Sequence, residues 1–208
     1  MRGPKIFGIV NITEDSFSDG GRNLDPAAAI VTARQLAADG ADVVDLGAAA
    51  SNIAAKLVAP AEEIRRLAPV IAALKDAHIA VSVDSFARET QRYALSAGVD
   101  FLNDIEGFAE PALYPQLAAA NCRLVVMHAV QGRGRARTIT VPAAEIWPRI
   151  EDFFSRRIAA LEAAGISRER LIIDPGMGFF LGSDADASLR VLAGLERLKR
   201  GFGLPVLV

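Results

Sequence analysis

Several features are scarce in this sequence, and each absence excludes a class of protein. Cys122 is the only cysteine, so an internal disulfide framework is excluded, and we expect a reducing compartment such as the cytoplasm. Aromatic residues make up 6% of the chain, too few for platforms on which nucleic-acid bases stack. The net charge is −2 and the pI is about 5.8, so no basic surplus points to nucleic acid or an anionic membrane.

Long hydrophobic runs and nucleotide-binding glycine motifs are also missing. No run of about 18 apolar residues occurs, so we expect no membrane-spanning helix. The amino terminus has a short apolar run, but polar and acidic residues (Asn11, Glu14 and Asp15) follow it directly. We therefore interpret residues 5–10 as a first strand and not as a signal peptide. No GxGxxG motif opens a helix, so a dinucleotide-binding fold has no support.

By contrast, apolar residues are abundant and make up 51% of the 208 positions. That is enough to fill the core of one domain, and we expect residues 1–208 to form a single domain. Short apolar runs alternate with helical patterns along the whole sequence. The predicted strands cover residues 5–10, 43–46, 79–83, 101–102, 123–127 and 171–173, and a seventh begins at 204–208. The predicted helices cover residues 26–39, 60–77, 88–98, 114–120, 143–164 and 187–201.

The strands are nearly continuous apolar runs, as in parallel strands that are covered on both faces. Repeated strand–helix alternation predicts an α/β fold with right-handed crossovers. A doubly wound sheet and a (β/α)8 barrel both fit this pattern. Polar residues close six successive strands, and functional residues from many strand ends are typical of the barrel. These residues are Asn11, Asp45, Asp84, Asn103 or Asp104, His128 and Asp174. We therefore predict a (β/α)8 TIM barrel of about six βα units plus a seventh strand.

A ring with several carboxylates suits a ligand that offers many N–H donors, develops positive charge or brings a metal. A nitrogen-rich heterocycle with an amino-amidine edge fits, because one carboxylate accepts two such bonds side by side. The alternative for each acid is a helix cap. Capping is weakest as an explanation for Asp174, which precedes Pro-Gly-Met-Gly, and Asp104 is more easily a cap than Asn103.

Three other features have competing interpretations. Asn11 opens a long loop that could act as a lid, and its side-chain carbonyl could help to hold Mg²⁺; a turn residue is the alternative. His128 could be a general base, but a hydrogen-bonded spacer is the better interpretation. The Arg- and Gly-rich segment 131–140 could meet an anionic substrate or another subunit, although a solvated loop is the simpler interpretation.

At this point the motifs resemble a known family, dihydropteroate synthase. The segments that carry the resemblance occur in the family's order and cover essentially the whole chain. They are Asn11-Ile-Thr13 with Asp15-Ser-Phe17-Ser, Val83-Asp84-Ser85, Asn103-Asp104-Ile105, Val126-Met127-His128 and Asp174-Pro-Gly-Met-Gly-Phe179. The segments 89–95 and 174–182 are similar to the sulfonamide-insensitive branch of this family.

The resemblance implies a (β/α)8 barrel enzyme of folate synthesis, a transferase. It would join 6-hydroxymethyl-7,8-dihydropterin diphosphate to p-aminobenzoate and release diphosphate. Mg²⁺ would be the cofactor, associated with Asn11, and the full-length protein would be a homodimer. Asp84 and Asp174 would be the catalytic acids. The implied substrate-binding residues are Asp45, Asp84, Asn103, Ile105, Met127, Asp174, Phe179, Phe17, Thr13 and Ser51.

Two departures from the family pattern stand out. The second loop usually reads Ser-Thr-Arg-Pro-Gly, but here residues 50–54 read Ala-Ser-Asn-Ile-Ala, without the arginine. The family's Ser-Arg-Lys after strand 7 and Arg-x-His after strand 8 do not occur before Val208. We therefore expect the 208-residue chain by itself to be poorly active and aggregation-prone. Two alternatives to the synthase remain, a non-catalytic pterin-binding fragment and a pterin-dependent methyltransferase barrel.

Overall fold

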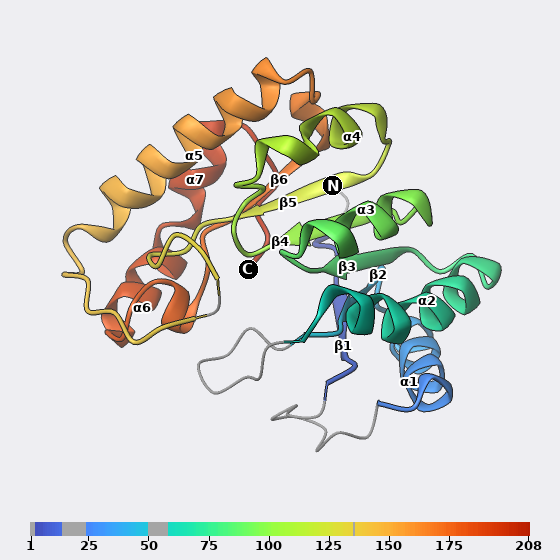
Figure 1. Ribbon diagram of the computed structural model, residues 1–208. Helices are drawn as coiled ribbons and strands as arrows, with labels where there is room; N and C mark the ends of the chain where they lie inside the picture. Colours follow the sequence, from blue (N-terminus) through green and yellow to red (C-terminus); the bar gives the residue numbers. More distant parts are fainter. Residues whose placement is uncertain (1–2, 14–23, 50–57, 135) are drawn as a thin grey trace. The chain divides into compact units, whose positions relative to one another are not determined.

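The computed structural model describes residues 3–13, 24–49, 58–134 and 136–208. Its strands run in sequence order in one sheet, and β1 with β2, β2 with β3 and β5 with β6 pair in parallel (Figure 1). They are β1 (Phe7–Asn11), β2 (Val43–Gly47), β3 (Val81–Asp84), β4 (Phe101–Asp104), β5 (Arg123–Met127) and β6 (Leu171–Asp174). The first six predicted strands are thus all present, with ends that differ by at most two residues.

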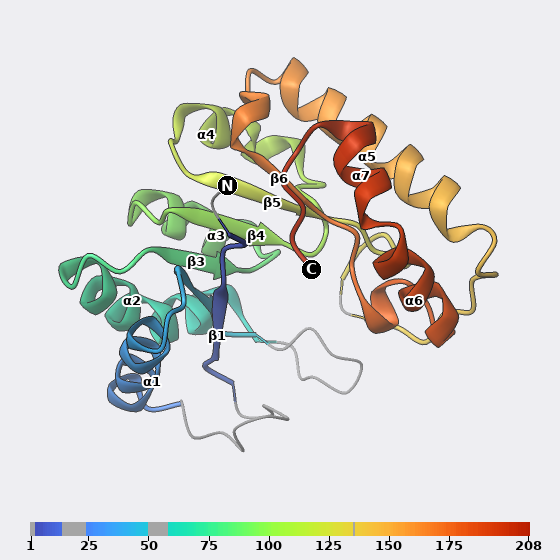
Figure 2. The same cartoon turned by 180° about the vertical axis from the view of Figure 1, so that it is seen from behind.

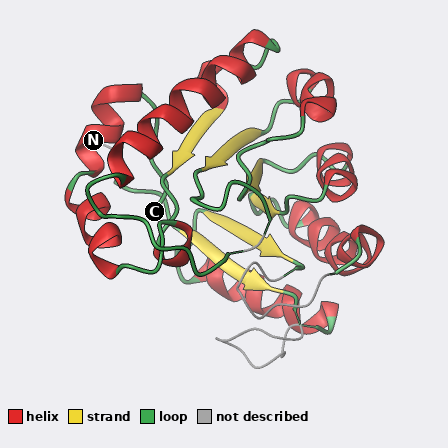
Figure 3. Cartoon of the chain, turned by 60° about the vertical axis from the view of Figure 1, so that its left-hand side comes forward, coloured by secondary structure: helices red, strands yellow, loops and turns green. Residues whose placement is uncertain are grey.

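Helices alternate with these strands (Figure 3). They are α1 (Pro26–Ala38), α2 (Pro60–Asp76), α3 (Arg88–Ser96), α4 (Tyr114–Ala119), α5 (Ile146–Ala163), α6 (Ala185–Ala193) and α7 (Leu195–Phe202), with short 3₁₀ turns at η1 (Pro111–Leu113), η2 (Arg168–Arg170) and η3 (Gly178–Phe180). The predicted start of α1 is confirmed: Asp25 Oδ1 accepts a hydrogen bond from Ala27 N, with Pro26 at the first helical position.

The chain has two compact units, one that ends at Leu102 and one that covers Asn103–Val208. In the first unit, α1 packs on β1 and β2, and α2 lies beside both α1 and α3 (Figure 2). The strand side chains that share one face are fully buried. They are Val10, Val44, Leu46, Val81 and Val83. This apolar face anchors the strands, and the opposite face carries the polar residues of interest.

In the second unit, β5 and β6 pair in parallel, from Leu124 with Leu171 to Met127 with Asp174. The amphipathic helix α5 supplies Ile146, Ile150 and Phe154 to the core, all fully buried. The Phe154 ring meets the Phe202 ring of α7 edge-on, 5.6 Å between centroids. These apolar contacts hold the two strands against the helices.

Two predicted elements differ from the structure. The helix predicted over 187–201 is two helices, because the chain breaks at Gly194, where an added Cβ would collide with the Trp147 ring. The segment that begins a predicted seventh strand forms a single parallel bridge, Val206 with Ile173. It lies where the next strand of the sheet belongs, since Ile173 N donates to Pro205 O and Leu207 N donates to Ile173 O.

Within the described residues, no helix is both long and apolar enough to cross a membrane.

Candidate active site

Three of the predicted site residues share one face of the sheet in the first unit. The register aligns Asn11 with Gly47 and Gly47 with Asp84, so these residues lie at one level at the ends of β1, β2 and β3. Asp45 aligns with Ile9 and Ser82, one step deeper on the same face. The structure therefore brings Asn11, Asp45 and Asp84 to adjacent strands on one surface.

Asp45 corrects the sequence prediction in one respect. It was expected to close its strand, but it is the middle residue of β2 and its side chain is only 8% exposed. The residue that ends the strand is Gly47, which has no side chain; an added Cβ would lie 3.4 Å from Asn11 Oδ1. Gly47 therefore places no side chain between Asn11 and Asp84 at this level.

Asp84 is partly buried and ends β3. Asp84 is not the N-cap of the following helix, which was the alternative interpretation of this residue. The N-cap residue of α3 is Ala87, and Ser85 Oγ accepts the hydrogen bond from Ala87 N. Ser85 is also tied to two buried side chains. Its hydroxyl donates to Glu63 Oε2 at 2.7 Å, and its carbonyl accepts from Gln91 Nε2 at 2.7 Å. The chain immediately after Asp84 is thus fixed by α2 and α3.

A second charged residue of α2 ties down the neighbouring strands. Arg66 is 6% exposed, and its Nη1 donates to the carbonyls of Ile12 and Ala48, each at 3.2 Å. Its Nε pairs with Glu62 at 2.7 Å. Ile12 follows β1 and Ala48 follows β2, so one guanidinium holds both loop beginnings in place.

The sequence predicted the helix over residues 60–77, but Glu63 and Arg66 were not identified there as buried residues. The signal was there: positions 63 and 66 are three apart and share the face of Leu67, Val70 and Leu74. Burial raises the pKa of Glu63, against the Ser85 hydrogen bond and the charge of Arg66. Buried charges on an apolar face indicate a structural or positioning role.

In the second unit, two adjacent side chains of β4 have different roles. Asp104 holds the following turn, since Oδ1 accepts from Glu106 N at 2.8 Å and Oδ2 from Phe108 N at 2.9 Å. Asn103 is 9% exposed, and its Oδ1 has no hydrogen-bond partner among the described residues. A buried acceptor without a donor is costly unless a ligand supplies one. Asp104 was predicted to be more easily a helix cap than Asn103; it accepts the backbone N–H groups of a turn, and the N-cap of the next helical element is Glu110.

Asp174 ends β6 beside Met127. Its Oδ1 accepts from Gly176 N at 2.7 Å and shapes the Pro-Gly turn. Gly176 has φ +69°, and an added Cβ would collide with the carbonyl of His128, so glycine is required there. His128 N donates to the carbonyl of Asp174, and its Nδ1 donates to Pro175 O at 3.1 Å. His128 is therefore the hydrogen-bonded spacer that the sequence favoured.

The remaining predicted residues fall into three groups. Thr13, Ile105 and Met127 are buried next to strand ends, and Thr13 Oγ1 has no hydrogen-bond partner in the described part of the chain. Phe179 lies in η3 and is 50% exposed. Phe17 and Ser51 lie outside the described residues. No cluster of three His, Cys, Asp or Glu side chains suited to a metal occurs within the described ranges.

The pH dependence of stability follows from His128. Burial lowers its pKa to about 4, from 6.5. The unfolded chain therefore binds a proton between pH 6.5 and 4 that the folded chain does not, and stability falls as the pH decreases through that window. The expected loss is about 3 kcal/mol. It is measured as the free energy of unfolding in urea from pH 7 to 4.

The control for this prediction is the other histidine. His128→Asn keeps a donor for Pro175 O but cannot titrate, so the stability difference between wild type and variant should shrink as the pH falls. His78 is exposed at φ +55°, a conformation that Asn tolerates, and His78→Asn should keep the wild-type pH profile. A constant difference between wild type and His128→Asn would contradict the assignment.

Comparison with known proteins defines the class. Residues 7–208 match the family described as pterin binding enzyme, so the chain belongs to the pterin-binding enzymes. Within that class it is a member of the dihydropteroate synthase family. The type-2 dihydropteroate synthase of Escherichia coli is 58% identical over 203 residues, which cover 98% of this chain and 74% of that protein.

Solved structures agree in fold. A Yersinia pestis dihydropteroate synthase, determined with a sulfonamide drug complex, has a TM-score of 0.88 and 31% identity, covering 99% of this chain and 74% of that one. A Xanthomonas albilineans dihydropteroate synthase in complex with 7,8-dihydropteroate has a TM-score of 0.75 and 33% identity, covering 98% and 69%. These neighbours have the TIM-barrel fold, and the predicted fold class is confirmed.

Proposed function

We propose that the protein condenses 6-hydroxymethyl-7,8-dihydropterin diphosphate with p-aminobenzoate, forming 7,8-dihydropteroate and releasing diphosphate. The observation that carries this function is the family relationship, 58% identity to a dihydropteroate synthase over 98% of the chain. The carboxylate and amide side chains at the strand ends supply the hydrogen-bond acceptors that a pterin substrate requires. A pterin ring presents several N–H donors along one edge, and carboxylates accept them in pairs.

In this proposal Asp174 and Asp84 bind the pterin N–H groups, Asn103 supplies its buried Oδ1 as a further acceptor, and Asp45 contributes a deeper negative charge. Ile105, Met127 and Phe179 line the slot for the flat ring. Thr13, Ser51 and Phe17 belong to the loops on the p-aminobenzoate side. This assignment explains why Asn103 Oδ1 and Thr13 Oγ1 lie buried without partners among the described residues.

The reaction breaks the bond between the pterin methylene carbon and the diphosphate oxygen and forms a carbon–nitrogen bond to the aniline nitrogen. Positive charge develops on the pterin methylene as diphosphate departs, and the acids stabilise it. The aniline nitrogen attacks this carbon and afterwards loses one proton. No covalent bond to the protein forms, and no Cys or Ser nucleophile is needed.

Mg²⁺ would fit beside Asn11. The side chain of Asn11 is partly buried at the end of β1, and its Oδ1 faces the gap left by Gly47. A neutral oxygen of this kind suits a hard cation that keeps most of its waters and binds chiefly to substrate phosphates. Bound there, the ion would offset the charge of the departing diphosphate. Asn11 itself would orient that end of the substrate.

The proposal extends to the protein's location, oligomeric state and response to sulfonamides. We expect a cytoplasmic enzyme that acts as a homodimer when full length and that resists sulfonamides, as the similarity of segments 89–95 and 174–182 to the insensitive branch implies. A non-catalytic pterin-binding fragment would bind the pterin without turnover. A pterin-dependent methyltransferase barrel would gain nothing from the diphosphate group.

Calorimetric titration with the pterin diphosphate, with and without Mg²⁺, tests the proposal. We expect binding that tightens at least tenfold when Mg²⁺ is present, because charge on the diphosphate is then offset. Asn11→Ala should reduce this gain while leaving the affinity for 6-hydroxymethylpterin, which has no diphosphate, unchanged. Equal affinity for both pterins in wild-type protein, with and without the metal, would refute the synthase assignment.

A further inference from the structure

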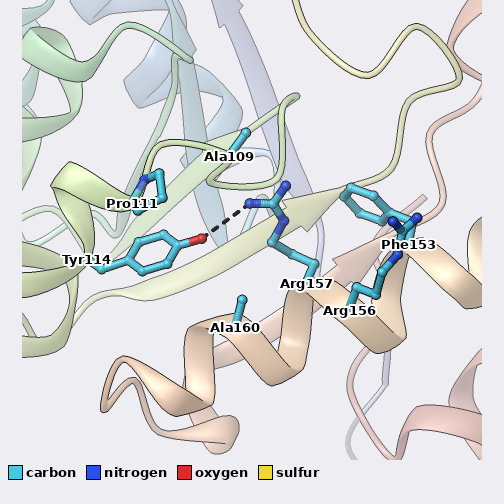
Figure 4. A pocket seen from close by; sticks show the side chains of 7 residues that line it. All are labelled: Ala109, Pro111, Tyr114, Phe153, Arg156, Arg157 and Ala160. Atoms are coloured by element: carbon cyan, nitrogen blue, oxygen red, sulfur yellow. Dashed lines mark hydrogen bonds between the residues drawn. The ribbon is translucent and has the colours of Figure 1, made fainter.

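A pocket in the second unit is assigned no role by the proposed reaction. It has a volume of about 340 Å³ and lies between the start of α4 and the middle of α5 (Figure 4). Its lining is mostly apolar or aromatic, with two arginines and no carboxylate: Ala109, Pro111, Tyr114, Phe153, Arg156, Arg157 and Ala160. A volume of this order can accept a molecule about the size of one substituted ring.

The guanidinium of Arg157 is held in place by neutral groups. Its Nη1 donates to the carbonyl of Phe108 at 2.6 Å and to the hydroxyl of Tyr114 at 3.3 Å. The Tyr114 hydroxyl in turn donates to the same carbonyl at 3.0 Å. Figure 4 shows the Arg157 side chain reaching across the pocket toward Tyr114. These bonds use one edge of the guanidinium and fix its plane.

The charge of Arg157 is not balanced locally. Its neighbour Arg156 pairs with Asp152 one turn back on α5, and Arg149 pairs with Glu145 in the same way. Among the described residues, no ion pair of this kind includes Arg157. The guanidinium carbon lies 5.6 Å from the centre of the Phe153 ring, a cation–π contact that leaves the charge in place.

We propose that this pocket binds a small aromatic carboxylate. The carboxylate would take the Nε and Nη2 edge of Arg157, since the bonds to Phe108 and Tyr114 come from Nη1, in the paired geometry that a guanidinium offers. The ring would lie against Pro111, Phe153 and Tyr114. Because a neutral carbonyl and hydroxyl already orient the guanidinium, little side-chain freedom is lost on binding.

Titration with benzoate tests this proposal, and NMR amide shifts locate the bound molecule, since a p-aminobenzoate site could also accept benzoate. We expect shifts at Ala109, Tyr114 and Ala160. The His128 ring should shift with them, because it meets Phe153 edge-on at 5.3 Å. The dissociation constant should be on the order of 1 mM. Benzamide, which has the same shape without the charge, should bind at least tenfold more weakly.

Arg157→Lys keeps the positive charge and one donor for Phe108 but loses the planar fork, so benzoate affinity at these amides should fall about tenfold. Arg200→Gln is the control, because Arg200 is exposed on α7 and does not line the pocket. Its benzoate affinity should equal that of wild type. Unchanged affinity in Arg157→Lys, equal binding of benzamide, or shifts only at other amides would each overturn the proposal.

Discussion

Asp174→Asn should weaken pterin binding roughly 100-fold or more, with the fold intact. Asn is nearly the same shape, and its Oδ1 can still accept the hydrogen bond from Gly176 N that shapes the turn. The other carboxylate oxygen becomes an NH2 group, which in the proposed site would oppose the pterin N–H donors with another donor. Hydrogen bonds to a charged acceptor contribute about 1.5–3 kcal/mol each, and an opposed donor pair adds a penalty.

The measurement is the calorimetric dissociation constant for 6-hydroxymethylpterin, and it does not depend on turnover. Asp184→Asn is the matched control: Asp184 caps α6 through Asp186 N, and Asn caps a helix equally well. Its pterin affinity should be unchanged. If Asp174→Asn also bound the pterin like wild type, Asp174 would be only a turn residue.

Arg66→Met should destabilise the protein by about 2–4 kcal/mol. Methionine fills a similar length of space but cannot donate to the carbonyls of Ile12 and Ala48, which the guanidinium now binds. Losing the partner of a buried polar group costs about 1–3 kcal/mol, and buried Glu63 would also lose a compensating charge. For a chain of this size the expected fall in melting temperature is roughly 5–15 °C.

Arg65 provides the control for this prediction. It is adjacent on α2 and pairs with the same Glu62, but its side chain is 68% exposed. Arg65→Met should therefore leave the melting temperature close to that of wild type. Arg66→Lys, which retains one donor and the charge, should recover part of the loss. If the Arg65 and Arg66 variants melted at the same temperature, α2 would not secure the ends of β1 and β2.

The fold was largely predictable because the apolar runs and their breakers are strong local signals. The register of β1, β2 and β3 places Asn11 and Asp84 at one level, at the carboxyl ends of their strands, as predicted for polar residues that close parallel strands. Asp45 was predicted to end its strand, because a polar residue near the end of an apolar run is easily taken for the last residue of that strand. In the structure it lies deeper, level with Ser82 of β3. The deciding residue is Gly47, which continues β2 but leaves no side chain there.

Tertiary contacts explain what sequence reasoning missed. The last helical segment breaks at Gly194. The Trp147 ring occupies the space of a Cβ there, a contact made across the second unit, so glycine is required at this position. In the sequence, Glu63 and Arg66 resemble ordinary surface charges of an amphipathic helix. They are buried because their face of α2 packs against the rest of the first unit. Cap preferences singled out Asp104 over Asn103, but the N–H groups that Asp104 accepts belong to a turn and not to a helix, a contact that acids beside tight turns commonly make.

The central claim is that this protein makes 7,8-dihydropteroate, and a direct product assay tests it. The purified protein, Mg²⁺, 6-hydroxymethyl-7,8-dihydropterin diphosphate and p-aminobenzoate are incubated together, and the products are identified by mass spectrometry. We predict one dihydropteroate and one diphosphate for each pterin diphosphate consumed, at a rate above the protein-free mixture and abolished without p-aminobenzoate. Pterin diphosphate that is bound by folded protein but recovered unchanged would contradict the account.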